Sequence, residues 1–316
     1  MDEYAFSRKL ETISAINITP FDETTRQIDW AALRANIEFL LENGAEVIVP
    51  CGNTGEFYAL TVEEAKEVTK RVVEFVGGRA IVMAGIGYAL ETAVELGRHA
   101  QEAGADCVMI HSPVHPYVTP QGALSYFRGI IERLDIPSVL YWKDASLPDD
   151  LLLSLAALPN LAGVKYAVND IPRFARTVRA ASKSRRIAWI CGTAEKWAPF
   201  FFNAGATGFT SGLINVHPAL SKAMLQSLRE RDWGTVWDLW EKALAFEELR
   251  AKFNNGNNVV VVKEAMERLG LRAGVAREPV SPLDEADREQ VAAILRGWGF
   301  IESDRRETKP KEEEFA

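Results

Sequence analysis

Lys165 is the residue of this chain whose type and position point most directly to chemistry. It lies near the end of the apolar stretch Leu161-Ala162-Gly163-Val164-Lys165-Tyr166, which is typical of a buried strand, and a polar turn from Asn169 to Pro172 follows. Burying a lone ammonium costs free energy, so such a residue needs a partner or a task. A lysine becomes a nucleophile near neutral pH when its pKa falls from about 10.4 to about 7 to 8, and burial supplies that shift. Taken alone, the segment also fits a lysine that emerges into solvent at a strand terminus.

Other polar residues stand directly after short apolar runs. A glycine-flanked loop, Gly52-Asn53-Thr54-Gly55-Glu56, contains a carboxamide, a hydroxyl and backbone amides that can hold a carboxylate. Further runs end at Tyr141, His111 and His115, Gly192 and Thr193, and Ser211 and Gly212. Each feature alone has another interpretation. The loop also fits a plain turn, and the tyrosine also fits a core residue whose hydroxyl is hydrogen-bonded. Together they predict a site.

An amine, a phenol that moves protons, and donors that bind a carboxylate are the groups that imine chemistry on a 2-oxo acid needs. The amine attacks the keto carbon, and the protonated imine then acts as an electron sink. Loss of the adjacent proton gives an enamine. That enamine either adds to an aldehyde or expels a hydroxyl group from the next carbon.

The elements that must position these groups alternate between short apolar runs and longer helical patterns. The predicted strands are Ile13 to Ile18, Glu46 to Pro50, Ala80 to Ala84, Asp106 to Ile110, Pro137 to Tyr141, Leu161 to Tyr166, Ile187 to Cys191 and Thr207 to Ser211. The predicted helices between them are Trp30 to Glu42, Val62 to Phe75, Glu91 to Ala103, Gln121 to Arg133, Asp149 to Leu158, Ile171 to Ala181 and Ala194 to Asn203. This alternation indicates parallel strands joined by crossover helices.

Eight such units predict a closed (β/α)8 barrel over residues 1–217, followed by a helical region at 218–300 and a disordered tail at 301–316. Glycines at 44, 104 and 205 stand between a helix and the next strand and are predicted to be helix C-caps. A doubly wound open sheet is the competing fold, but the chain has no nucleotide-binding glycine fingerprint after its first strand. In a barrel, the residues that follow the strands all meet at one end, where active sites lie.

Two features of the predicted C-terminal helices have alternative interpretations. Trp233, Trp237 and Trp240 share one helix face, which is typical of a core or subunit interface rather than a cofactor site. The run Asn254 to Asn258 fits a polar interhelix turn or, alternatively, a loop that contacts substrate.

Composition excludes several classes of function. The 316 residues are 47% hydrophobic and 25% charged, with a net charge of −8, which excludes a wholly disordered chain and gives no electrostatic footprint for nucleic acid or an anionic membrane. We expect a small-molecule partner, and a cytoplasmic location because no signal peptide is evident and the three cysteines fall in apolar runs. His99, His111, His115 and His217 have no metal-ligand spacing, so no metal site is expected.

The chain resembles the family of dihydrodipicolinate synthase and N-acetylneuraminate lyase, the Schiff-base aldolases and dehydratases. The resemblance rests on Thr19-Pro20-Phe21, the loop at 52–56 followed by Leu60 to Glu64, Tyr141, Gly163-Val164-Lys165, Asn215 to Pro218, and Lys263 to Met266 with Leu269-Gly270-Leu271. It implies a barrel lyase that acts on pyruvate or a related 2-oxo acid without metal or organic cofactor, assembled as a dimer or tetramer. Lys165 would then form the imine and Tyr141 act as general acid and base. Asn53 and Thr54 would occupy the paired-threonine positions that grip the substrate carboxylate and relay protons, which makes Thr54 a further catalytic candidate.

Departures from the synthase pattern leave the substrate open. Pro113-Val114-His115 replaces a Pro-Tyr-Tyr sequence and so lacks the tyrosine that a neighbouring subunit lends to the proton relay; His115 either takes over that role or is an ordinary hydrogen-bonded histidine. Ser146 replaces the arginine that would hold the carboxylate of aspartate semialdehyde.

Three functions therefore remain after the sequence is read. An aldol synthase or lyase is the first expectation. A sugar-acid dehydratase of the 5-dehydro-4-deoxyglucarate type is the second, because Asn169 to Arg173, Thr193 to Glu195 and Gly55 to Phe57 resemble that branch, although Tyr166 replaces its acidic residue after the lysine. A ligand-binding protein without turnover is the third.

Overall fold

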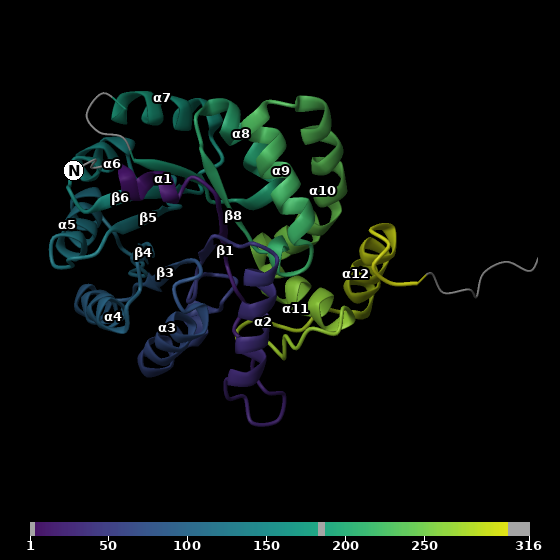
Figure 1. Cartoon of the computed structure of the whole chain (residues 1–316). Helices are drawn as coiled ribbons and strands as arrows, with labels where there is room; N and C mark the ends of the chain where they lie inside the picture. Colours follow the sequence, from purple (N-terminus) through teal and green to yellow (C-terminus); the bar gives the residue numbers. More distant parts are fainter. Residues whose placement is uncertain (1–3, 183–186, 303–316) are drawn as a thin grey trace, which may run out of the picture.

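Eight parallel strands close a barrel in sequence order in the computed structural model, which describes residues 4–182 and 187–302 (Figure 1). The strands are β1 (Ile13–Ala15), β2 (Val47–Ile48), β3 (Ile81–Ile86), β4 (Cys107–Ile110), β5 (Ser138–Trp142), β6 (Leu161–Tyr166), β7 (Ala188–Cys191) and β8 (Gly208–Ser211). Parallel pairing of β1 with β8 completes the closure. The predicted (β/α)8 barrel is therefore confirmed, with a strand at each predicted position.

A ring of helices surrounds the strands, and each member follows one strand in the chain. They are α2 (Trp30–Glu42), α3 (Val62–Val76), α4 (Leu90–Ala103), α5 (Pro120–Ile131), α6 (Asp149–Ala156), α7 (Ile171–Ala181), α8 (Ala194–Ala204) and α9 (Pro218–Glu230). Helix α9 packs against α8 and β1. It thus fills the eighth place of the ring.

Local sequence signals determine where several of these helices begin and end. Gly44, Gly104 and Gly205 have φ of 77°, 91° and 120°, the left-handed region that turns the chain back to the sheet, as predicted. Asp170 caps α7 by accepting a hydrogen bond of 2.9 Å from the backbone N–H of Arg173. This cap fixes the point at which the chain leaves β6, the strand that carries Lys165.

Side chains fill the barrel interior. Its core consists mainly of apolar residues from the strands, and Tyr141 is one of them. Leu10, which directly follows the short helix α1 (Ala5–Lys9), also belongs to this core. Helix α1 was not among the predicted helices. The interior core is Leu10, Ile16, Val47, Val49, Met83, Cys107, Met109, Val139, Tyr141, Ala162, Ala188 and Ile190. Because the interior is packed, a ligand has room only beyond the ends of the strands.

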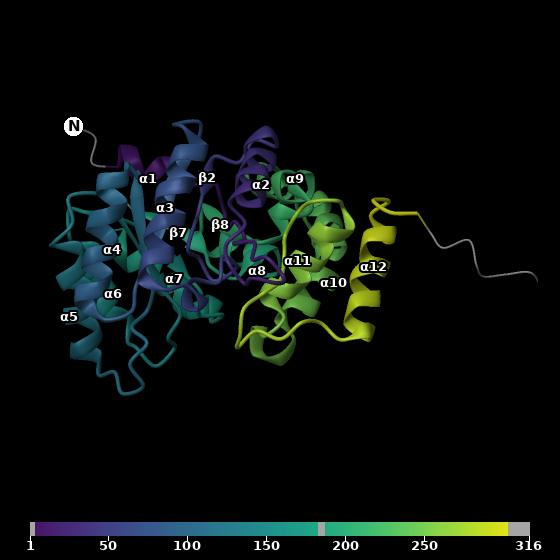
Figure 2. The same cartoon turned by 90° about the horizontal axis from the view of Figure 1, so that it is seen from below.

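The C-terminal helices lie on one side of the barrel (Figure 2). They are α10 (Trp233–Asn255), α11 (Asn258–Arg268) and α12 (Glu285–Gly297); α10 packs on α8 and α9, and α11 and α12 follow outward. The tryptophan face of α10 meets α8, where Trp240 donates a hydrogen bond of 2.8 Å to the carbonyl oxygen of Lys196, while Trp237 is 40% exposed. The backbone of α10 breaks at residues 252–254, just before the asparagine run.

The tail predicted at 301–316 lies outside the described residues, apart from its first two positions. Among the residues that the structure describes, no helix combines the length and apolar composition that a membrane span requires.

Candidate active site

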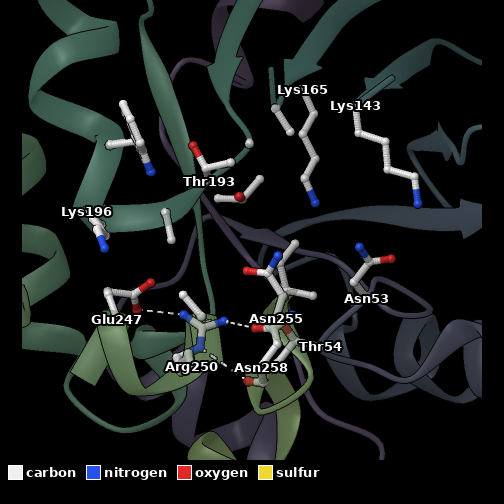
Figure 3. Close-up of a pocket in the computed structure, with 18 of the residues that line it drawn as sticks. Asn53, Thr54, Lys143, Lys165, Thr193, Lys196, Glu247, Arg250, Asn255 and Asn258 are labelled. Carbon is white, nitrogen blue, oxygen red and sulfur yellow. Dashed lines mark hydrogen bonds and ion pairs between the residues drawn. The ribbon is translucent and has the colours of Figure 1, made fainter. Parts of the chain in front are cut away.

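A cavity of about 710 Å³ opens at the carboxyl ends of the strands, where the sequence predicted a site. Its walls come from the loop after β2, the ends of β5, β6 and β8, the β7–α8 connection and the α10–α11 segment (Figure 3). The cavity therefore joins the barrel to the C-terminal helices.

Lys165 lies at the bottom of this cavity and is only 4% exposed. Its Nζ is 4.0 Å from the centroid of the Tyr141 ring, because the two residues are direct partners in the β5–β6 register. The pKa of Lys165 is lowered to about 7, mainly by burial; the charges of Lys143 and Arg250 contribute to this shift, and Cys191 opposes it. The side chain therefore does not emerge into solvent. At neutral pH, a large fraction of the protein molecules have Lys165 as an uncharged amine.

Tyr141 is held at both its backbone and its hydroxyl. Ser112 donates a hydrogen bond of 3.0 Å to its carbonyl oxygen, and the Nδ2 of Asn53 donates one of 3.1 Å to its phenolic oxygen. Burial raises the pKa of Tyr141 well above its ordinary value, so the phenol keeps its proton. Since the phenolic oxygen accepts from Asn53, its own O–H remains available to donate to a substrate.

The glycine loop is held in place from behind. Cys51 and Glu56 flank it with φ of 57° and 58°, a left-handed conformation that is uncommon outside glycine. The Glu56 carboxylate forms a buried ion pair with Lys263 of α11 at 2.5 Å, and Lys263 also donates to the carbonyl oxygen of Thr19 at 2.8 Å. We call this arrangement the Lys263 brace. It fixes the loop from which Asn53 and Thr54 enter the cavity, while Gly52 and Gly55 only shape the loop and lie outside the lining.

Gly192 and Thr193 line the cavity beside the lysine, as the sequence predicted. A Cβ at Gly192 would stand 3.0 Å from the Cγ of Lys165, so any larger residue would press on the nucleophile. Thr193 donates a hydrogen bond of 2.9 Å to the Oδ1 of Asn169, which also faces the cavity.

Besides Gly52 and Gly55, two more predicted site residues, Ser211 and His115, lie outside the cavity lining. Ser211 faces outward from the barrel, where its hydroxyl donates to the carboxylate of Glu195 on α8 at 2.5 Å, and the preceding residue, Thr210, lines the cavity instead. The reason is that successive strand residues face opposite sides of a sheet. His115 is exposed on the loop after β4, where its Nδ1 accepts a hydrogen bond of 3.1 Å from the N–H of Tyr117, and it does not line the cavity of its own chain.

Several residues line the cavity that the sequence had not singled out. Lys143 enters it from the end of β5, with its Nζ 5.6 Å from the ring centroids of both Tyr58 and Tyr141. Its position two residues after Tyr141 is a usable signal, since alternate strand residues share a face. Asn254, Asn255 and Asn258 also line the cavity, which favours the substrate-contacting alternative for the asparagine run over a plain turn.

Arg250 of α10 crosses above the end of β8. It forms an ion pair of 2.6 Å with Glu247, and its guanidinium also donates to the Oδ1 of Asn258 at 2.5 Å. A Cβ at position 212 would lie 2.3 Å from the Nη2 of Arg250, so the glycine at the end of β8 is what allows this close approach. The pair is buried within α10, and the hydrogen bond to Asn258 links α10 to α11 beside the cavity.

In chemical terms, the cavity combines a buried amine with a lowered pKa, a protonated phenol beside it, and amide and hydroxyl groups on the adjacent loop. These groups are suited to nucleophilic attack on a carbonyl carbon, followed by proton transfer to and from the resulting adduct. Among the residues that the structure describes, no group of three or more His, Cys, Asp or Glu side chains could hold a metal ion.

Comparison with known proteins agrees with this geometry. The model of the Dihydrodipicolinate synthetase family matches residues 9–297. A crystal structure of dihydrodipicolinate synthase from Oceanobacillus iheyensis is 60% identical, with a TM-score of 0.92 over 95% of this chain and 100% of that one. A 4-hydroxy-tetrahydrodipicolinate synthase from Methanoculleus marisnigri is 37% identical over 89% of this chain and 97% of the relative. A relative named "Probable 5-dehydro-4-deoxyglucarate dehydratase", from Bradyrhizobium sp. (strain ORS 278), is 28% identical over 88% of this chain and 89% of its own length.

Proposed function

This chain belongs to the dihydrodipicolinate synthetase family and is a lyase, and we propose that it forms an imine between Lys165 and pyruvate or a related 2-oxo acid. The observation that carries the proposal is the buried amine of Lys165, with its pKa lowered to about 7, facing the cavity 4.0 Å from the Tyr141 ring. An amine in this state is nucleophilic at neutral pH without a metal or an organic cofactor.

The reaction follows from the groups around that amine. The uncharged Nζ of Lys165 attacks the keto carbon of the acid and forms a carbinolamine. The phenol of Tyr141 supplies a proton to the departing hydroxyl, so that water leaves and a protonated imine remains. The phenolate then takes up a proton, and the hydrogen bond from Asn53 stabilises it while it is charged.

The carboxylate of the acid is assigned to the glycine loop. Asn53 and Thr54 line the same cavity as Lys165, and the Lys263 brace holds the loop that carries them. Donors held in place before the substrate arrives bind an anion without the cost of reorganising the loop.

The second half of the reaction has two candidates. Aldol addition or cleavage at the enamine carbon is the first, and it is the type of reaction expected from the synthase relatives. Loss of a hydroxyl group from a sugar acid is the second, and a specific observation favours it. The cavity wall beyond Lys165 is polar, with amides from Asn169, Asn254, Asn255 and Asn258 that suit a hydroxylated chain.

The use of aspartate semialdehyde has less support. Ser146, at the position of the expected arginine, does not line the cavity, and its hydroxyl donates to Asp144 at 2.6 Å. A serine in that place cannot form the two parallel hydrogen bonds of an arginine–carboxylate pair.

Borohydride reduction tests the proposed function. The protein is reduced in the presence of pyruvate and, separately, of a 2-oxo-3-deoxy sugar acid, and peptide mass spectrometry locates any adduct. We expect a stable adduct on Lys165 with at least one of the two compounds and no adduct in Lys165→Ala. Turnover should persist after treatment with a metal chelator.

The same experiment contains its own counter-result. Absence of an adduct in the native protein, or an adduct on another lysine, would contradict the assignment of Lys165.

Assembly as a homo-oligomer, either a dimer or a tetramer, stays a prediction. Sedimentation velocity of the purified protein measures the oligomeric state directly.

A further inference from the structure

The basic residues of the cavity differ in whether their charge is already paired. Besides Lys165, the described lining contains Lys143, Lys196 and Arg250. Arg250 is paired with Glu247 at 2.6 Å, and Lys196 with Glu248 at 3.3 Å. Among the residues that the structure describes, the ammonium of Lys143 has neither a hydrogen bond nor an ion pair, and burial lowers its pKa.

The carboxylate nearest to Lys143 along the chain is engaged elsewhere. The Oδ1 of Asp144 accepts hydrogen bonds from the backbone N–H of Ser146 at 2.9 Å and from its hydroxyl at 2.6 Å. Asp144 therefore caps its own turn, and the ammonium of Lys143 points into the cavity beside Lys165 (Figure 3). Lys143 is exposed at the cavity and has no anionic partner among the described residues, so its charge is free to pair with an anionic group of a ligand.

A second unpaired polar atom lies on the same side of the cavity. The Oδ1 of Asn53 is buried and has no hydrogen-bond partner among the described residues, while its Nδ2 is used by Tyr141. An amide oxygen in this state accepts a hydrogen bond from a ligand hydroxyl. Figure 3 shows Asn53 and Lys143 on the same side of the cavity, with Lys165 beside Lys143.

We propose that Lys143 binds a second anionic group of the substrate, so that the enzyme prefers 2-oxo acids carrying a further carboxylate over those with an apolar chain. The inference rests on the proposed function, because the first carboxylate and the keto carbon are placed by the glycine loop and Lys165. Lys143 is on this account a specificity-determining residue, which selects the chain beyond the keto carbon and takes no part in the covalent step.

The test compares trapping of matched acids on Lys165. Borohydride adducts are quantified against the concentration of 2-oxoglutarate, of 2-oxovalerate, which has a methyl group in place of the second carboxylate, and of pyruvate. The pH of each trapping reaction is set on the upper plateau of the pH profile of that variant, above the lowered pKa of Lys165 (about 7 in the native protein), so that the amine is uncharged in each case. We expect the native protein to trap 2-oxoglutarate at roughly 10- to 100-fold lower concentration than 2-oxovalerate, the range of a charged hydrogen bond.

Variants separate the anion-binding role from a structural one. Lys143→Met should abolish the preference for 2-oxoglutarate while leaving the half-saturating concentration of pyruvate unchanged, and Lys143→Arg should restore the preference. Lys70→Met removes an equal charge from the exposed surface of α3 and should leave the preference intact.

Each alternative outcome has a definite meaning. Equal trapping of 2-oxoglutarate and 2-oxovalerate by the native protein would overturn the inference while keeping the imine. A loss of pyruvate trapping in Lys143→Met equal to that of 2-oxoglutarate would overturn it as well, because Lys143 would then serve the first carboxylate or the nucleophile. No adduct with any acid in the native protein would defeat the proposed function itself.

Discussion

Lys165 and Tyr141 stand opposite each other on neighbouring strands, whereas Arg250 and Asn254 reach the same cavity from a helix and the loop that ends it. We call Tyr141, Lys143 and Lys165 the strand wall, and Arg250, Asn254, Asn255 and Asn258 the helix wall. The strand wall is placed by the backbone ladder of the barrel. The helix wall depends on side-chain contacts and on three successive left-handed residues, with φ of 54°, 54° and 70° at positions 253–255.

The difference separates chemistry from recognition. Groups that exchange protons must be held within a fraction of an ångström, which a sheet register provides. A loop of amides on a helix end can vary in sequence without disturbing that register. We therefore expect substitutions of Tyr141 and Lys165 to change the rate of reaction, and substitutions of Lys143 and of the helix wall to change substrate choice or stability.

Lys165→Ala should have the largest effect on activity. Turnover should fall by roughly 10⁴-fold or more, because Lys165 is the amine that lies 4.0 Å from the Tyr141 ring and has its pKa lowered to about 7. The free energy of unfolding should decrease less than it does when an apolar core side chain is truncated. The reason is that the substitution also removes the unfavourable burial of an amine. Steady-state kinetics and urea denaturation measure the two quantities, and retention of substantial turnover would contradict the role of the lysine.

Tyr141→Phe keeps the ring beside Lys165 and removes only the hydroxyl. Turnover should fall by roughly 10²- to 10⁴-fold if the phenol moves protons. Binding of the 2-oxo acid should change little, so kcat should fall more than KM rises. A rate equal to that of the native enzyme would return Tyr141 to a packing role.

Arg250→Met tests the helix wall. Glu247 would remain buried at 6% side-chain exposure without its partner, and the free energy of unfolding should fall by about 3 to 5 kcal/mol. Lys196→Met is the matched control, because it breaks the more exposed pair with Glu248 and should cost less than about 1 kcal/mol. Equal urea midpoints for the two variants would show that the buried pair does not hold the wall in place.

The pH dependence should show the smallest effect and links the two walls. The uncharged amine is the reactive form, so kcat/KM should rise as pH increases toward about 7, the lowered pKa of Lys165, and level off above it. Lys143 and Arg250 lower that pKa and Cys191 raises it. Lys143→Met should therefore move the rising limb to higher pH, while Lys70→Met should not; an unmoved limb would mean that Lys143 does not act on the nucleophile.

Strands and helices of the barrel were predictable because their apolar periodicity and glycine caps are local signals. The strand wall was partly predictable for the same reason. Lys165 was recognised as an ionisable residue inside an apolar strand, yet Lys143 was missed although it shares a face with Tyr141 two residues earlier. Ser211 was chosen over Thr210 because strand boundaries alone do not tell which of two neighbours faces the cavity.

The helix wall was less accessible to sequence reasoning. Arg250 lies in an amphipathic helix where an arginine ordinarily faces solvent, and only tertiary packing brings it over the end of β8. His115 illustrates the converse, since the loop after β4 has no periodicity from which its direction could be read. Neither the secondary-structure propensity of a residue nor the spacing of residues along the chain encodes contacts between distant segments.

The Lys263 brace sets an order in which the enzyme can become active during its synthesis on the ribosome. Asn53 and Thr54 are made early, but the ion pair that fixes their loop needs a residue from α11, near the end of the chain. A nascent chain can thus contain Lys165, and even all eight strands, before its carboxylate-binding loop is fixed. The reactive amine gains a fixed carboxylate-binding loop only when α11 docks, so a chain terminated before Lys263 lacks part of its site.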